Sequence, residues 1–202
     1  MRMLSTDFSA PSLSISVCSG NVRCPSPAAV MSHKYVEWGD NKLTHVWRDA
    51  GFGSGARMAI GDVTMGLQTG LVEAVNTAPL VVAGYSWFRH LPYMINLRWG
   101  PLSGATLVDR RTWERIPEEL RPELKRIAEE TGELVASRLL DWEAEAIEAM
   151  VEQGMQVIDP PPAMMEEWLQ IFHRSRSLLR GEIIPADLFD ETIRLGAGGG
   201  DR

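Results

Sequence analysis

The chain has 202 residues, with 20 Lys and Arg against 27 Asp and Glu, so its formal net charge is −7. This acidic balance argues against a nucleic-acid-binding protein, because such proteins need clustered Lys and Arg to neutralise phosphates. A content of 45% hydrophobic and 23% charged residues excludes a collagen-like or wholly disordered chain. No run of about 18 apolar residues is present, so we expect no membrane-spanning helix.

Residues 1–33 are rich in serine and show no hydrophobic period. Such a segment buries too little apolar surface to offset its ordering entropy, and we expect a disordered or unrelated leader. Its first residues lack the apolar stretch of an export signal, so no signal peptide is readable. Cys18 and Cys24 have no His or Cys pair nearby to complete a zinc site, and we interpret them as idle thiols rather than as a disulfide.

From Lys34 onward, short apolar runs bounded by Gly, Asp and Pro predict alternating strands and helices. We expect strands at 34–38, 56–60, 71–75, 94–97 and 105–108, and helices at 41–50, at 62–69 and from 79 to about 88. Gly51 and Gly70 directly follow two of these helices, at the position that favours positive φ. The alternation predicts an α/β layer rather than a helical bundle.

The second half of the chain is mainly helical. After Pro117, apolar residues recur at three- and four-residue steps and predict one amphipathic helix of about thirty residues that ends at Gly154. Its apolar face consists of Leu120, Leu124, Ile127, Leu134, Trp142, Ala146 and Met150. A short strand at 155–158 and helices at 163–179 and 185–195 follow. The many acidic residues of 114–152 are interpreted as a solvated helix face.

Signals of catalysis are weak. The four histidines stand in no metal-binding or catalytic spacing, and the sequence has neither a Gly-x-Ser-x-Gly elbow nor a phosphate-binding loop. The acidic residues of the long helix are spaced for solvent rather than as a catalytic pair. We therefore expect a protein that is not an enzyme and that uses no cofactor and no metal ion.

The seven tryptophans exceed what a core of this size requires. Those on apolar helix faces, Trp142 among them, are interpreted as core. Trp38, Trp87 and Trp99 stand near strand ends and loop junctions. We hypothesise that these three line a cleft for a small organic molecule, because such clefts are mostly apolar and aromatic.

Residues 67–79 read Leu-Gln-Thr-Gly-Leu-Val-Glu-Ala-Val-Asn-Thr-Ala-Pro and resemble a motif of the DctP-type solute receptors of TRAP transporters. The similarity continues through 87–94, 109–121 and 184–190, so that it covers about 34–195. The resemblance implies an α/β fold of the periplasmic-binding-protein type (type II), with two lobes and a long C-terminal spine helix. It covers only the C-terminal portion of such a receptor. We therefore expect residues 34–202 to form an incomplete receptor, namely the second lobe with its C-terminal helices.

The same resemblance implies a function. A receptor of this family captures an organic acid or similar small molecule, such as a carboxylate, and passes it to the membrane subunits of a TRAP transporter in the periplasm. Asn76 and Thr77 lie at the carboxyl end of a predicted strand, where an amide and a hydroxyl can hydrogen-bond a carboxylate. The alternative is that both residues cap the helix beginning at Pro79. The resemblance favours the ligand role, and we add Gln68 of the same motif to the candidate ligand-binding residues.

Three departures from the family pattern keep a second hypothesis open, of which Glu73-Ala74 in place of the family's Asp-Gly is the mildest. Many of these receptors hold the substrate carboxylate with an arginine on an early strand, but the nearest alignment places Tyr35 or Val36 there. Lys34 supplies charge without a planar fork, so a simple dicarboxylate is less expected than a more apolar or differently anchored ligand. The chain is also shorter than these receptors. The second hypothesis is a truncated, non-binding remnant whose apolar surface is covered by a homo-oligomer or a partner protein.

Overall fold

The computed structural model describes residues 2–3, 15–18, 26–38, 45, 48–53, 55–97 and 106–197. The chain divides into two compact units, which are described separately. The sheet unit comprises 16–76, 87–97 and 155–202, and the spine unit comprises 1–15, 77–86 and 98–154. Among the described helices, none is long and apolar enough to cross a membrane.

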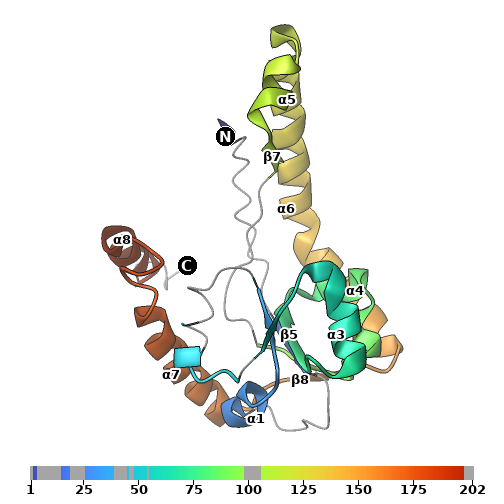
Figure 1. Cartoon of the computed structure of the whole chain (residues 1–202), viewed down its shortest axis with the longest axis vertical. Coiled ribbons are helices and arrows are strands. Elements are labelled where there is room, and N and C mark those ends of the chain that lie inside the picture. Colours follow the sequence, from blue (N-terminus) through green and yellow to red (C-terminus); the bar gives the residue numbers. More distant parts are fainter. Residues whose placement is uncertain are drawn as a thin grey trace. The chain divides into compact units, whose positions relative to one another are not determined.

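The sheet unit centres on a four-stranded sheet with the order β5-β2-β6-β8 (Figure 1). The strands are β2 (Ile15–Cys18), β5 (Ala74–Thr77), β6 (Tyr93–Ile95) and β8 (Gln156–Ile158). β6 runs antiparallel to β2 and parallel to β8. A separate parallel pair joins β3 (Val36–Glu37) to β4 (Ala56–Arg57), and Tyr35 pairs with Ala74 at the start of β5.

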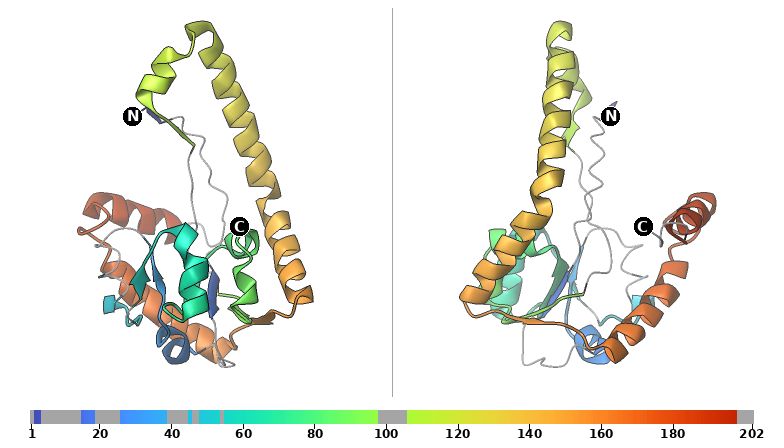
Figure 2. Two further views of the ribbon diagram at one scale, coloured as in Figure 1. Left: turned by 45° about the vertical axis from the view of Figure 1, so that its right-hand side comes forward. Right: turned by 180° about the vertical axis from the view of Figure 1, so that it is seen from behind.

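The described part of the sheet unit also contains helical segments. They are α1 (Pro27–Met31), η1 (Ile60–Asp62), α3 (Val63–Thr69), η2 (Trp87–Arg89), α7 (Pro162–Ser177) and α8 (Ala186–Ala197). α1 lies beside α7 (Figure 2). One buried cluster joins α1 and α7 to the strands and their flanking loops. It consists of Val30, Met31, Tyr35, Ala50, Phe52, Ala74, Ile95, Leu97 and Trp168.

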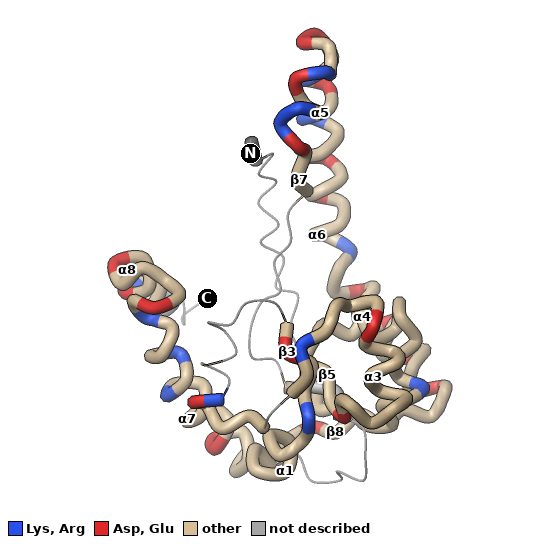
Figure 3. Tube along the Cα trace, viewed as in Figure 1, with Lys and Arg blue, Asp and Glu red and all other residues tan. Residues whose placement is uncertain are grey.

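The spine unit is dominated by a long helix. Its elements are β1 (Arg2–Met3), α4 (Pro79–Gly84), β7 (Leu107–Val108), α5 (Arg110–Arg115), η3 (Glu118–Leu120) and α6 (Arg121–Glu152). β1 and β7 form an antiparallel pair, and α4 packs against α6. Arg121 joins α5 to the first turn of α6, because its guanidinium donates to the carbonyl oxygens of Glu114 (3.2 Å) and Ile116 (3.0 Å). Figure 3 shows how densely charged residues occupy α5 and the adjacent turns of α6.

Local sequence signals predicted the ends of several elements correctly. Gly51, Gly70 and Gly154 all have positive φ, as expected of residues that follow a helix. The strand expected at 71–75 begins later, at Ala74, because the Val72 backbone N–H still donates to Gly66 at the end of α3. The helix expected from 79 to about 88 ends at Gly84 and is followed by η2. Most of the helix expected at 41–50 lies outside the described residues.

The disorder expected for residues 1–33 is not what the described parts of this segment show. β2 pairs with β6 inside the sheet, and α1 forms with Ser26 at its N-cap. Val30 and Met31 of α1 are buried in the core cluster. The sequence pattern missed both elements because their stability comes from tertiary partners rather than from a local hydrophobic period.

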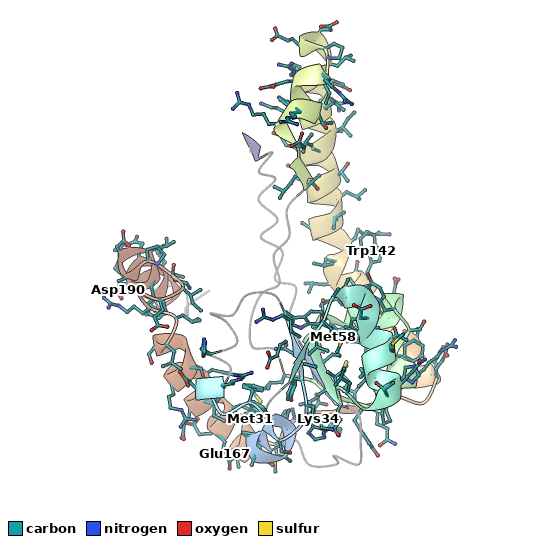
Figure 4. All side chains as sticks on the ribbon, viewed as in Figure 1. Met31, Lys34, Met58, Trp142, Glu167 and Asp190 are labelled. Atoms are coloured by element: carbon teal, nitrogen blue, oxygen red, sulfur yellow. The ribbon has the colours of Figure 1, made fainter. Side chains whose placement is uncertain are left out.

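The length of α6 agrees with the prediction, but its expected core face does not. Met150 is only 1% exposed, whereas Leu124, Ile127 and Leu134 are exposed and Trp142, expected in the core, is 36% exposed (Figure 4). The fully buried positions of α6 are Gly132, Glu143 and Met150. They lie on an adjacent side of the helix, since each residue advances the helix by about 100°. α4 packs beside the C-terminal half of α6 and covers only that part (Figure 2).

Glu73 joins the chain before β5 to the start of β3. Its carboxylate accepts the Lys34 backbone N–H (3.3 Å) and pairs with Lys34 Nζ (3.2 Å). The backbone hydrogen bond, followed by the side-chain contacts with Lys34, lowers the pKa of Glu73 below its ordinary value of 4.5. Since the folded pKa lies below the unfolded one, this stabilisation is present above about pH 4.5 and is lost as the pH falls through the folded pKa.

We expect Glu73→Gln to reduce the loss of stability in acid, measured as urea-unfolding free energy at a series of pH values below about 4.5. At neutral pH the variant loses less than about 1 kcal/mol, because the Glu73 side chain is 38% exposed and its ion pair is screened. Glu167→Gln, an exposed site on α7 (Figure 4), is the matched control. If the unfolding free energies of the two variants depend on pH in the same way, the contacts between Glu73 and Lys34 are not a source of the acid sensitivity.

Candidate ligand-binding site

A pocket of about 30 Å³ lies in the sheet unit where β3 and β5 end. Tyr35 pairs in parallel with Ala74, so the residues two positions further along each strand, Glu37 and Asn76, reach the same edge. The lining consists of Tyr35, Val36, Glu37, Trp38, Arg48, Phe52, Gly53 and Asn76. This volume holds roughly two water-sized groups, which fits the end of a ligand rather than a whole molecule.

Aromatic rings form the apolar part of the lining. Tyr35 and Phe52 meet edge to face, with ring centroids 5.4 Å apart, and the Tyr35 hydroxyl donates to the Val30 carbonyl oxygen at 2.8 Å. Trp38 stacks on Trp87 at 6.4 Å, and its indole N–H donates to the Asn76 carbonyl oxygen at 2.9 Å. These contacts fix the orientation of the Trp38 ring against Trp87 and the Asn76 backbone.

The pocket contains one residue of each charge. Arg48 Nη2 lies 3.3 Å from Glu37 Oε1, and the same oxygen accepts the Gly55 backbone N–H at 3.3 Å. The Glu37 side chain is 15% exposed, whereas the Arg48 side chain is 54% exposed. Glu37 therefore belongs to the wall, and Arg48 presents a guanidinium that reaches solvent.

The six candidate residues from the sequence separate in the structure. Trp38 and Asn76 line the pocket. Trp87 is fully buried behind Trp38, and its indole N–H donates to Thr64 Oγ1 at 3.1 Å. Thr77 is buried at the end of β5, Gln68 is exposed on α3, and neither is among the described lining residues. Trp99 lies outside the described residues. Ligand binding by these six residues stays a prediction.

The capping alternative for Asn76 and Thr77 is not supported. The N-cap position of α4 is Ala78, and no side chain among the described residues makes a capping hydrogen bond there. Asn76 accepts the Trp38 indole N–H with its backbone carbonyl oxygen, and it is one of the residues that line the pocket.

Sequence reasoning missed the two charged residues of the pocket. Glu37 stands between apolar residues near the end of a short strand, which is a weak signal of a polar site there. Arg48 precedes the Gly51 turn and carries no local signal, because only the return of the chain through Phe52 and Gly53 brings it to β3. Across the described part of the chain, no group of three or more His, Cys, Asp or Glu is placed to hold a metal ion.

One family model matches more than half of the chain, and solved structures share its fold. The model of the family "Bacterial extracellular solute-binding protein, family 7" (DctP) matches residues 45–176. A TRAP periplasmic solute binding protein from Shewanella oneidensis with bound succinate superposes with a TM-score of 0.78 at 14% identity, covering 90% of this chain and 59% of that one. One from Desulfovibrio salexigens with bound orotic acid gives 0.74 at 15% identity, covering 94% and 60%.

The ectoine binding protein TeaA of the TeaABC TRAP transporter gives a TM-score of 0.70 at 14% identity, covering 93% of this chain and 62% of that one. The chain therefore spans about 60% of the length of these solved relatives. No curated protein matches the sequence. The likeness to the solved structures confirms the expected α/β, type II binding-protein fold.

Proposed function

The chain belongs to family 7 of the bacterial extracellular solute-binding proteins (DctP), and we propose that it binds a small organic acid for uptake by a TRAP transporter. In this role it delivers the solute, in the periplasm, to the membrane subunits of the transporter. The ligands of the relatives support this class of substrate, since the Shewanella oneidensis protein holds succinate and the Desulfovibrio salexigens protein holds orotic acid.

The observation that carries the proposal is the presence of Arg48 in a pocket with an aromatic wall. A guanidinium has five N–H donors in a planar fork, and a carboxylate accepts two of them in parallel. The described contacts of Arg48 engage Nη2 with Glu37, which leaves further donors for a ligand. Arg48 thus supplies the planar guanidinium that the strand at 34–38 lacks, and Asn76 adds an uncharged residue to the lining.

We expect Arg48→Ala to weaken binding by about 10- to 100-fold, because a hydrogen bond to a charged group contributes about 1.5–3 kcal/mol. Binding is measured by isothermal titration calorimetry, with ligands first identified by thermal-shift screening against organic acids. Asn76→Ala should weaken binding less, by about fivefold, because a neutral amide forms a weaker hydrogen bond with a carboxylate than a guanidinium does.

Arg174→Ala, at an exposed site on α7, is the control for a change of net charge. Equal affinities for Arg48→Ala and Arg174→Ala would remove Arg48 from the site. A folded, monodisperse protein that binds nothing in the screen would count against the receptor assignment as a whole.

One observation favours the second hypothesis, a non-binding remnant that is stabilised by self-association or by a partner protein. Leu124, Ile127 and Leu134 are exposed along one side of α6, and exposed apolar groups in a row are typical of an interface. Light scattering coupled to size-exclusion chromatography separates the hypotheses when it is run beside the binding screen. Oligomers without ligand binding favour the remnant, and a ligand-binding monomer favours the receptor.

A further inference from the structure

The carboxylate of Glu37 is built into the pocket beside the arginine. Glu37 Oε1 accepts both Arg48 Nη2 and the Gly55 backbone N–H, each at 3.3 Å. Among the residues that the structure describes, no hydrogen bond reaches Glu37 Oε2. The side chain is largely buried, so its negative charge is screened by solvent much less than an exposed carboxylate would be.

This negative charge bears directly on which acids can bind. A ligand carboxylate that pairs with Arg48 must lie within a few ångströms of Glu37, because the two side chains are in contact. Two carboxylates that share a partly buried site repel each other, and a dianion brings a second negative charge into the same pocket. A ligand that carries a cation next to its carboxylate removes this repulsion, since the cation can pair with Glu37.

The remaining lining fits a cation as well. Tyr35, Trp38 and Phe52 are among the lining residues, and aromatic faces attract ammonium and guanidinium-like groups. Because the pocket holds only the end of a ligand, both charged groups must lie at that end, separated by only a few bonds.

We propose that the ligand of this pocket is a small zwitterion, whose carboxylate binds Arg48 and whose ammonium or amidinium group binds Glu37 Oε2 against the aromatic wall. This inference rests on the proposed function, because it specifies the substrate class of the same pocket. Glu37 acts in it as a selectivity residue that disfavours simple anions.

Two pairs of probes test the proposal by isothermal titration calorimetry on the full chain. Alanine and propionate differ by the ammonium group alone, and ectoine and succinate compare a larger zwitterion with a dianion. We expect each zwitterion to bind at least about tenfold more tightly than its partner, because complementary charge governs selectivity in such a site. Glu37→Gln should weaken zwitterion binding by about tenfold and leave propionate and succinate binding equal or stronger.

Glutamine keeps an oxygen that can accept the Gly55 N–H, so the variant preserves this backbone contact. Circular dichroism checks that the variant is folded, and propionate binding checks that the pocket still accepts a carboxylate. Glu167→Gln on α7 is the matched control. Anions that bind as tightly as the zwitterions, or a ranking that Glu37→Gln leaves unchanged, would overturn this inference while leaving the receptor proposal intact. Failure of all four probes on folded protein would overturn the inference and weaken the receptor proposal with it.

Discussion

Trp87→Ala is expected to lower the free energy of unfolding by about 3–5 kcal/mol, the usual cost of deleting a buried aromatic side chain. Trp87 has no exposed surface, stacks on Trp38 and donates its indole N–H to Thr64 Oγ1. Its removal leaves a cavity behind the pocket and takes away the support of the Trp38 ring. The variant should therefore lose ligand affinity as well as stability, and urea unfolding followed by calorimetry measures both.

Trp142→Ala is the matched control, because it deletes the same side chain from a site on α6 where that side chain is 36% exposed. We expect it to cost less than half as much as Trp87→Ala, since less apolar surface returns to water. Equal losses at the two sites would show that Trp87 is not the support of the pocket. Trp87→Phe keeps a buried ring and should retain most of the stability.

Gly55→Ala is expected to cost about 3 kcal/mol or more, at the upper end of the range for steric overpacking. A Cβ on Gly55 would lie 2.0 Å from the Tyr35 carbonyl oxygen and 3.0 Å from Glu37 Cγ. That carbonyl accepts the Ala56 backbone N–H at 3.0 Å, so β3 and β4 cannot keep their pairing with a methyl group between them. Pushing β3 and β4 apart also displaces Glu37, so ligand selectivity should weaken together with stability.

Gly61→Ala provides the comparison, because a Cβ there would meet no atom within 4 Å. Its unfolding free energy should stay within about 0.5 kcal/mol of the parent, as for most surface substitutions. If the two alanine variants unfold at the same urea concentration, the close approach of β3 to Gly55 is not a requirement of the fold.

The predicted effects concern a pocket that is built from three segments of the chain. β3 brings Glu37 and Trp38, β5 brings Asn76, and the turn before β4 brings Phe52 and Gly53. Arg48 reaches the same place from the preceding helical turn. The ligand-binding proposals therefore depend on strand pairing, and a defect in the β3–β4 pair should weaken ligand selectivity.

Part of this site was predictable from the sequence, because it depends on local signals. Asn76 stands at the end of a strand that follows a Gly-terminated helix, and Trp38 stands at the end of another. Such positions are recognisable from turn chemistry and hydrophobic runs alone. Trp87 shares the same local pattern, yet the structure buries it, because exposure depends on what packs above the ring.

The sequence alone was sufficient to identify the family, the fold class and the long helix. It also located Gly70 after α3 and Gly154 at the end of α6, which both have positive φ. These features depend on motifs and contacts between residues a few positions apart. The tertiary structure decided which face of α6 is buried, that α1 and β2 belong to the sheet unit, and that Arg48 meets Glu37. The physical reason is the same in each case. Burial and charge pairing are properties of surfaces brought together by distant parts of the chain, and no local period records them.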